Sequence, residues 1–133
     1  MKRRDFIQNT VAGTALLASG MTLSSFGTAK KHLTVLHTND VHSHIDPFPK
    51  TDPRNPNRGG VARRAALIES IRTENPNVLL LDAGDIFQGT PYFNYYGGEI
   101  EFKLMSMMKY DAATLGNHDF DNGIEGFYAQ LPH

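Results

Sequence analysis

The sequence predicts an α/β fold built on a parallel sheet. Short apolar runs alternate with longer segments whose apolar residues recur at helical spacing, in the order strand, helix, strand, helix, strand, helix. Short crossovers of this kind build parallel sheets with right-handed connections. Each predicted strand also ends in a polar motif, and the working loops of such sheets gather at the carboxyl ends of the strands. At 133 residues the chain is long enough for one small domain.

Composition narrows the class of protein. The chain is 40% hydrophobic and 20% charged, which is typical of a soluble globular protein. A formal net charge of −1 argues against a surface that binds nucleic acid. The sequence contains no cysteine, which excludes disulfides, iron–sulfur clusters and thiolate zinc sites within this chain.

The first 29 residues have the pattern of a secretory signal peptide. Lys2, Arg3 and Arg4 precede a short stretch of apolar and small residues, and a small-residue cleavage signal ends at Ala29. The paired arginines resemble the twin-arginine signal, although an ordinary leader would share most of these features. We therefore expect cleavage after Ala29, contact with the membrane only during export, and a periplasmic or other extracytoplasmic location.

The first predicted strand, residues 33–36, is a short apolar run that feeds a polar loop. Residues 46–60 contain four prolines and are predicted to be loop. Apolar residues at helical spacing predict a helix over residues 61–74, which ends before Asn75-Pro76.

The remaining elements follow the same alternation. The continuous apolar run at residues 78–81 predicts a strand buried on both faces. Residues 87–98, rich in glycine and aromatic residues, are expected to be loop. Residues 99–108 are expected to form a helix, residues 112–115 a third strand, and residues 123–131 the start of a third helix. The side chains expected to point inward from the second helix are Ile100, Leu104, Met107 and Met108.

Three polar motifs follow the three predicted strands: Asp40-Val41-His42, Gly84-Asp85 and Gly116-Asn117-His118-Asp119. Their positions predict that they converge at one edge of the sheet. They supply carboxylate, imidazole and amide ligands of the kind that bind a pair of divalent metal ions.

Several of these residues have more than one interpretation. Asp40 and His42 would point the same way in an extended segment and could bind one ion. Asp85 could bridge two metals, or could only cap a turn beside Gly84, which allows the backbone to turn tightly. His118 could donate a proton, with its ring oriented by either Asp121 or Asp119.

Two further histidines lie near the first motif. His37 is expected to support its loop rather than to bind metal. His44 remains an open candidate, because one more extended step would keep it on the side of the ligands.

Taken together, residues 37–42, 82–85 and 116–121 resemble the 5′-nucleotidase branch of the calcineurin-like metallophosphoesterases, which also includes UDP-sugar hydrolases and cyclic phosphodiesterases. The resemblance implies the N-terminal half of a four-layer α/β/β/α sandwich. It implies that Asp40 and His42 bind the first metal, that Asp85 bridges both metals and that Asn117 binds the second. His118 would assist the leaving group, with Asp121 holding its ring.

The resemblance also implies a function. The expected protein is an exported hydrolase of phosphate monoesters, nucleotides in particular, with two divalent ions (Mn, Zn, Fe or Co) and a metal-bound hydroxide. Its partner would be a small phosphorylated substrate and not a nucleic acid. The later histidine ligands of the family, in a Gly-His-x-His motif, have no counterpart before His133. Residues 30–133 are therefore expected to be a C-terminally truncated domain. The alternative to an active hydrolase is a fragment that is inactive alone or needs a complementing C-terminal half.

Overall fold

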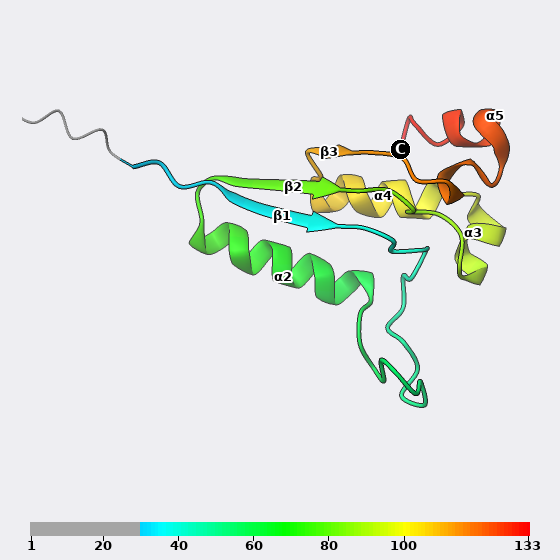
Figure 1. Cartoon of the computed structure of the whole chain (residues 1–133), viewed down its shortest axis with the longest axis horizontal. Coiled ribbons are helices and arrows are strands. Elements are labelled where there is room, and N and C mark those ends of the chain that lie inside the picture. The colour runs from blue at the N-terminus through cyan, green and yellow to red at the C-terminus, as the bar shows by residue number, and fades with distance from the viewer. Residues whose placement is uncertain (1–29) are drawn as a thin grey trace, which may run out of the picture. The chain divides into compact units, whose positions relative to one another are not determined.

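The computed structural model describes residues 30–133, and His32–His133 form one compact unit. The predicted signal peptide and its twin-arginine motif lie outside the described residues. The predicted strands and helices follow one another in the predicted order, with one additional short helix after the second strand (Figure 1). No helix in the described part of the chain is both long and apolar enough to cross a membrane.

Three parallel strands form the sheet in the order β1-β2-β3: β1 (Thr34–Thr38), β2 (Val78–Asp82) and β3 (Ala112–Ala113). Thr38 at the end of β1 pairs with Asp82 at the end of β2, and Asp82 pairs with Ala113. The three carboxyl ends therefore lie side by side, so the loops that follow them share one edge of the sheet.

Helices α2 (Val61–Glu74) and α4 (Glu99–Met108) pack against one face of this sheet. Leu36 of β1 and Leu80 of β2 share a core with residues of both helices. Burial of these aliphatic side chains is the main force that holds helices to a sheet. The buried members of this core are Val61, Ile68, Leu80 and Met108.

A second, largely aromatic core lies beyond the ends of the strands. Here α3 (Pro91–Tyr96), η1 (His118–Phe120) and α5 (Gly123–Tyr128) surround the loop that follows β2 (Figure 1). The ring of Phe87 in that loop lies 5.3 Å from the ring of Phe93 and 5.0 Å from that of Phe102. Aromatic pairs at such distances add to the stability gained from burial. The loop is thus anchored by its own apolar side chains.

The structure corrects the prediction that residues 87–98 are all loop, because α3 lies within them. Pro91 begins this helix, and proline is favoured at that position because its missing N–H is not needed there. Gly97 ends it in the left-handed conformation that commonly terminates helices. Six residues are too few to show helical periodicity in the sequence.

The burial predicted for α4 is also partly wrong. Met107 is 77% exposed, whereas Glu101 is buried. The buried stripe of α4 consists of Glu101, Met105 and Met108, at a spacing of four and three residues. That stripe places Met107 on the solvent side of the helix.

The strand ends and burial also differ from expectation. In β2, Leu80 and Asp82 are buried, but Leu79 and Leu81 are only partly so, and Val35 of β1 is 53% exposed. In the described part of the chain, helices cover one face of the sheet, so β2 is not buried on both faces. β3 has two residues instead of four, and α5 ends at Tyr128.

Candidate metal centre

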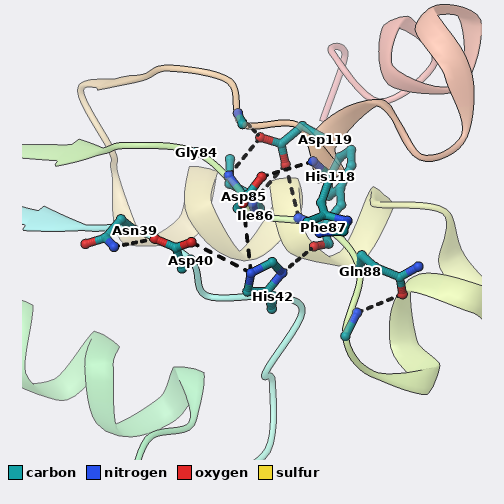
Figure 2. Close-up of polar contacts among 12 residues, drawn as sticks. Asn39, Asp40, His42, Gly84, Asp85, Ile86, Phe87, Gln88, His118 and Asp119 are labelled. Carbon is teal, nitrogen blue, oxygen red and sulfur yellow. Dashed lines mark hydrogen bonds and ion pairs between the residues drawn. The ribbon is translucent and has the colours of Figure 1, made fainter.

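Asp40, His42 and Asp85 meet at the carboxyl edge of the sheet. Their potential ligand atoms all lie within 4.8 Å of one another. His42 Nε2 is 3.8 Å from Asp40 Oδ1 and 4.0 Å from Asp85 Oδ2 (Figure 2). Two carboxylates around one imidazole nitrogen form a donor set that suits Mn, Fe, Co or Zn. The described residues therefore fit one divalent ion at this position.

The two loops that carry these ligands are joined backbone to backbone. The N–H of Asp40 donates to the carbonyl of Gly84 at 3.0 Å, and the N–H of His42 donates to the carbonyl of Asp85 at 3.1 Å. These bonds continue the pairing of β1 and β2 past the ends of the strands. The relative placement of the ligands is therefore set mainly by backbone contacts.

The backbone at the ligands is left-handed rather than extended. The φ angles are +50° at Asp40, +45° at His42 and +55° at Asp85. The extended segment expected for the first pair is therefore wrong, and its two side chains meet through left-handed turns. Asp and His adopt this conformation more readily than bulky or β-branched residues do.

Neighbouring groups orient the first two ligands. His42 Nδ1 lies 3.3 Å from the carbonyl oxygen of Phe87, an acceptor that favours the proton on Nδ1. Nε2 then carries the lone pair, on the side of the two carboxylates, where it is available to a metal ion, as in most metal-binding histidines. The side-chain amide of Asn39 donates to Asp40 Oδ2, which leaves Oδ1 facing His42.

Asp85 has a different environment at each oxygen. Its Oδ2 faces His42, while its Oδ1 accepts a hydrogen bond from the backbone N–H of His118 at 3.0 Å. The side chain is only 16% exposed. Asp85 thus connects the first motif to the third.

Two glycines allow the second and third motifs to pack closely. A Cβ at Gly84, where φ is +94°, would lie 2.4 Å from the nitrogen of Gly116. A Cβ at Gly116 would lie 2.0 Å from Asp85 Oδ1. Both contacts are far shorter than real Cβ atoms show. The tight turn predicted at Gly84 is confirmed, and Gly116 clears the space that the Asp85 carboxylate occupies.

Asp119 holds these two loops together. Its Oδ1 accepts the N–H of Ile86 at 2.8 Å and that of Phe87 at 3.1 Å. Its Oδ2 accepts the N–H of Asp85 at 3.0 Å and that of Gly116 at 2.8 Å (Figure 2). The side chain is 1% exposed. The alternative in which Asp119 orients His118 is therefore wrong, because both of its oxygens are bound to backbone groups.

Asp121 is the residue that contacts His118. Its Oδ2 lies 2.9 Å from His118 Nδ1. This hydrogen bond raises the pKa of His118 and lowers the pKa of Asp121. The ring of His118 also lies edge-on to the ring of His42, with centroids 5.2 Å apart. The pair is thus adjacent to the ligand cluster.

The other predicted residues lie around this cluster. Asn117 is exposed and immediately precedes η1. His37 is exposed on β1, outside the cluster. The ring of His44 packs against that of Phe48 at 4.3 Å. Among residues 30–133, the acidic and histidine group that could hold a metal is Asp40, His42 and Asp85, so His44 does not join it.

Sequence reasoning missed three supporting residues. Asn39 contacts Asp40, and Ser43 contacts Glu101 through a buried hydrogen bond. The sequence offers only a weak signal for Asn39 and Ser43, which lie directly beside the predicted ligands. It offers no signal for Glu101, because acidic residues on helices are usually exposed.

Comparison with known proteins places this site in a family. The family model described as calcineurin-like phosphoesterase matches residues 33–133. The chain is 50% identical over 102 residues to the snake venom 5′-nucleotidase of Naja atra, covering 74% of this chain and 19% of that protein. It is 47% identical over 122 residues to the human 5′-nucleotidase, covering 89% of this chain and 21% of that protein. The chain thus spans about a fifth of the length of these curated relatives.

Solved structures give the same result for the fold. A 5′-nucleotidase precursor from Thermus thermophilus superposes with a TM-score of 0.67 at 44% identity, covering 75% of this chain and 20% of that one. The NAD nucleotidase of Haemophilus influenzae superposes with a TM-score of 0.68 at 35% identity, covering 75% and 19%. The predicted α/β fold with parallel strands is therefore confirmed, and the chain belongs to the calcineurin-like phosphoesterase family.

Proposed function

We propose that this chain carries the first metal site and the proton donor of an exported, metal-dependent phosphoesterase of the 5′-nucleotidase type. The observation that carries the proposal is the ligand cluster of Asp40, His42 and Asp85 beside the His118–Asp121 pair. A substrate phosphate bound at this edge of the sheet would meet both groups at once.

The residues divide into two sets of ligands. Asp40 and His42 would bind the first ion, Asn117 would bind the second, and Asp85 would bridge the two ions. When bound, two divalent ions neutralise phosphate oxygens and activate water for attack on phosphorus. Asp85 is suited to the shared position, because one of its oxygens faces His42 and the other faces the loop that carries Asn117.

His118 would supply the proton to the leaving oxygen. Its Nδ1 is engaged by Asp121, so Nε2 is the nitrogen left for the substrate. The raised pKa of His118, caused first by this hydrogen bond, increases the fraction of imidazolium near neutral pH. An imidazolium in that position can donate a proton as the ester bond breaks.

The substrate class follows from the relatives. Two proteins named 5′-nucleotidase match 74% and 89% of this chain, at 50% and 47% identity. We take a nucleoside monophosphate as the substrate, and a location outside the cytoplasm reached through the signal in residues 1–29. The names of two relatives, a venom protein and a precursor, support export.

Hydrolysis assays with added Mn²⁺ or Zn²⁺ test the proposal, with AMP and a chromogenic phosphomonoester as substrates. We expect metal-dependent release of phosphate that falls by about 10²-fold or more in His118→Ala, in line with the usual contribution of a general acid. His37→Ala is a matched control, since His37 is exposed and lies outside the cluster. Full activity in Asp85→Ala or His118→Ala would refute the assignment.

A second candidate is a chain that binds metal without turnover of its own. Within this chain the second ion has two proposed ligands, Asp85 and Asn117, whereas such ions usually take four to six. Calorimetric titration with Mn²⁺ separates the two candidates. One tightly bound ion per chain without phosphate release supports the second, and two bound ions with turnover support the first.

A further inference from the structure

The metal-binding loop has a strained backbone that needs support. Besides Asp40 and His42, Ser43 is also left-handed, with φ at +55°. Three of the four residues 40–43 thus adopt a conformation that non-glycine residues rarely adopt. Such conformations persist only where the surroundings enforce them.

Ser43 is the buried anchor of this loop. Its side chain is almost completely buried, and its hydroxyl donates to Glu101 Oε1 on α4. The hydroxyl of Thr90, in the loop that follows β2, lies 2.7 Å from the carbonyl oxygen of Ser43 and 2.9 Å from its Oγ. Side-chain hydrogen bonds therefore hold Ser43 from two sides: from α4 and from the loop that follows β2.

The second carboxylate oxygen of Glu101, Oε2, does not take part in the bond to Ser43. Glu101 is 4% exposed. Among the described residues, the buried side-chain atoms without a hydrogen-bond partner are Glu101 Oε2 and Arg64 Nε. Both residues line one cavity of about 10 Å³ beneath the metal-binding loop, between α2 and α4. Its other polar walls are Ser43, His44, Asp82 and Tyr110.

The size and chemistry of this cavity suit one water molecule. A volume of about 10 Å³ is close to the smallest that accepts a water, and a buried water needs two to four polar partners. Arg64 Nε–H is a donor and Glu101 Oε2 is an acceptor, so one water can accept from the first and donate to the second.

We propose that Glu101 is a positioning residue for the metal site. Through Ser43 on one side, and through a single buried water shared with Arg64 on the other, it holds residues 40–43 in the conformation that aims Asp40 and His42 at Asp85. The link to metal rests on the proposed function, whereas the support of the loop does not. The network joins α2 and α4 to the ligands from beneath the site.

Amide hydrogen exchange by NMR, without metal, tests the support of the loop in the whole chain. The N–H groups of Asp40, His42 and Ser43 donate hydrogen bonds to carbonyls of the loop that follows β2. Their exchange rates therefore report how often residues 40–43 separate from that loop. In Glu101→Met, which keeps the length of the side chain but removes both oxygens, we expect these amides to exchange at least tenfold faster. Glu101→Gln should stay within about threefold of the parent, because its amide can still accept from Ser43 and contact the water.

Two further variants keep the test decisive. Glu99→Met changes the same residue type on the same helix, but Glu99 is partly exposed and paired with Lys103, so it should leave the loop unchanged. Ser43→Ala removes the hydroxyl that contacts Glu101 and should also accelerate exchange, which matters if Glu101→Met does not fold. If the amides of residues 40–43 exchange at the rate of the parent chain in both Glu101→Met and Ser43→Ala, the proposal is overturned.

Titration with Mn²⁺ separates this inference from the proposed function. We expect Mn²⁺ affinity to fall at least tenfold in Glu101→Met and to recover in Glu101→Gln. If the parent chain binds no Mn²⁺ but amide exchange is still faster in Glu101→Met, the proposed metal function is refuted. The role of Glu101 in holding residues 40–43 is then still supported. A crystal structure of the parent should show a water within hydrogen-bond reach of Arg64 Nε and Glu101 Oε2, and a fully defined cavity without one would overturn that part.

Discussion

Asp119→Asn provides the sharpest test of how this site is held together. The substitution keeps the shape of the side chain but replaces one carboxylate oxygen with an NH₂ group. Each oxygen of Asp119 accepts two backbone N–H groups. Whichever way the amide turns, its NH₂ must therefore face two N–H donors that have no other acceptor at that position.

The size of the effect follows from these bonds. A buried donor left unsatisfied costs about 1–3 kcal/mol, so two of them give a loss of about 2–6 kcal/mol in the free energy of unfolding. Whole domains are stable by about 5–15 kcal/mol, so this loss is a large share of the total stability. The substitution should also disturb the candidate metal centre, because the affected amides include that of Asp85.

Urea unfolding followed by circular dichroism at neutral pH measures this loss. Asp121→Asn is the matched control, since Asp121 lies two residues away but is exposed, and its side-chain partners are the imidazole of His118 and the side chain of Gln88. An exposed pair of this kind contributes about 0–1 kcal/mol, so the control should unfold close to the parent. If the free energy of unfolding of Asp119→Asn is also within about 1 kcal/mol of the parent's, the four bonds do not hold the two loops together.

Three further substitutions test other parts of the structure. Gly116→Ala places a methyl group 2.0 Å from Asp85 Oδ1, so Mn²⁺ affinity measured by calorimetry should fall at least tenfold, and an unchanged affinity would contradict the close packing. Phe87→Ala should lower the free energy of unfolding by about 3–5 kcal/mol in urea titrations, as is usual for a buried aromatic residue, and a loss below about 1 kcal/mol would show that the aromatic core does not anchor the loop. Burial raises the pKa of Asp82, so the stability contributed by its protonated form is lost as pH rises through that raised pKa. Asp82→Asn should therefore gain stability relative to the parent as the pH rises above about 4, and parallel pH profiles of the two proteins would exclude this effect.

The sequence was most informative where a regular pattern ran far enough to be read. The bounds of α2 and α4 agree with the prediction, because 14 and 10 residues cover several helical turns. The convergence of the three motifs followed from the geometry of parallel sheets alone. In contrast, α3 was missed, since a helix of six residues is shorter than the window in which periodicity can be recognised.

The details of the site depended on tertiary contacts that no local pattern encodes. Asp40 and His42 were expected to share a side through extended backbone, yet they meet through left-handed turns. Those turns are fixed by bonds to residues 84–86, more than forty positions along the chain. Asp119 and Asp121 could not be distinguished by spacing, because either can approach His118 from a tight turn. They are distinguished only in the folded structure, where the carboxylate of Asp119 accepts four backbone N–H groups.

Burial sorts the acidic residues around this site into two kinds. Asp119 and Glu101 are almost inaccessible, and the hydrogen bonds seen at their oxygens come from backbone N–H groups or a hydroxyl. A carboxylate in that setting is stabilised by hydrogen bonds from neutral groups and is closed off from a metal ion in solvent. Asp40, by contrast, is 58% exposed and faces His42 on the same side as Asp85. Two carboxylates on one imidazole repel each other unless a cation lies between them. The carboxylates of Asp40 and Asp85, which face each other across His42, are therefore suited to bind a metal ion. The buried carboxylates of Asp119 and Glu101 hold the loops that carry them.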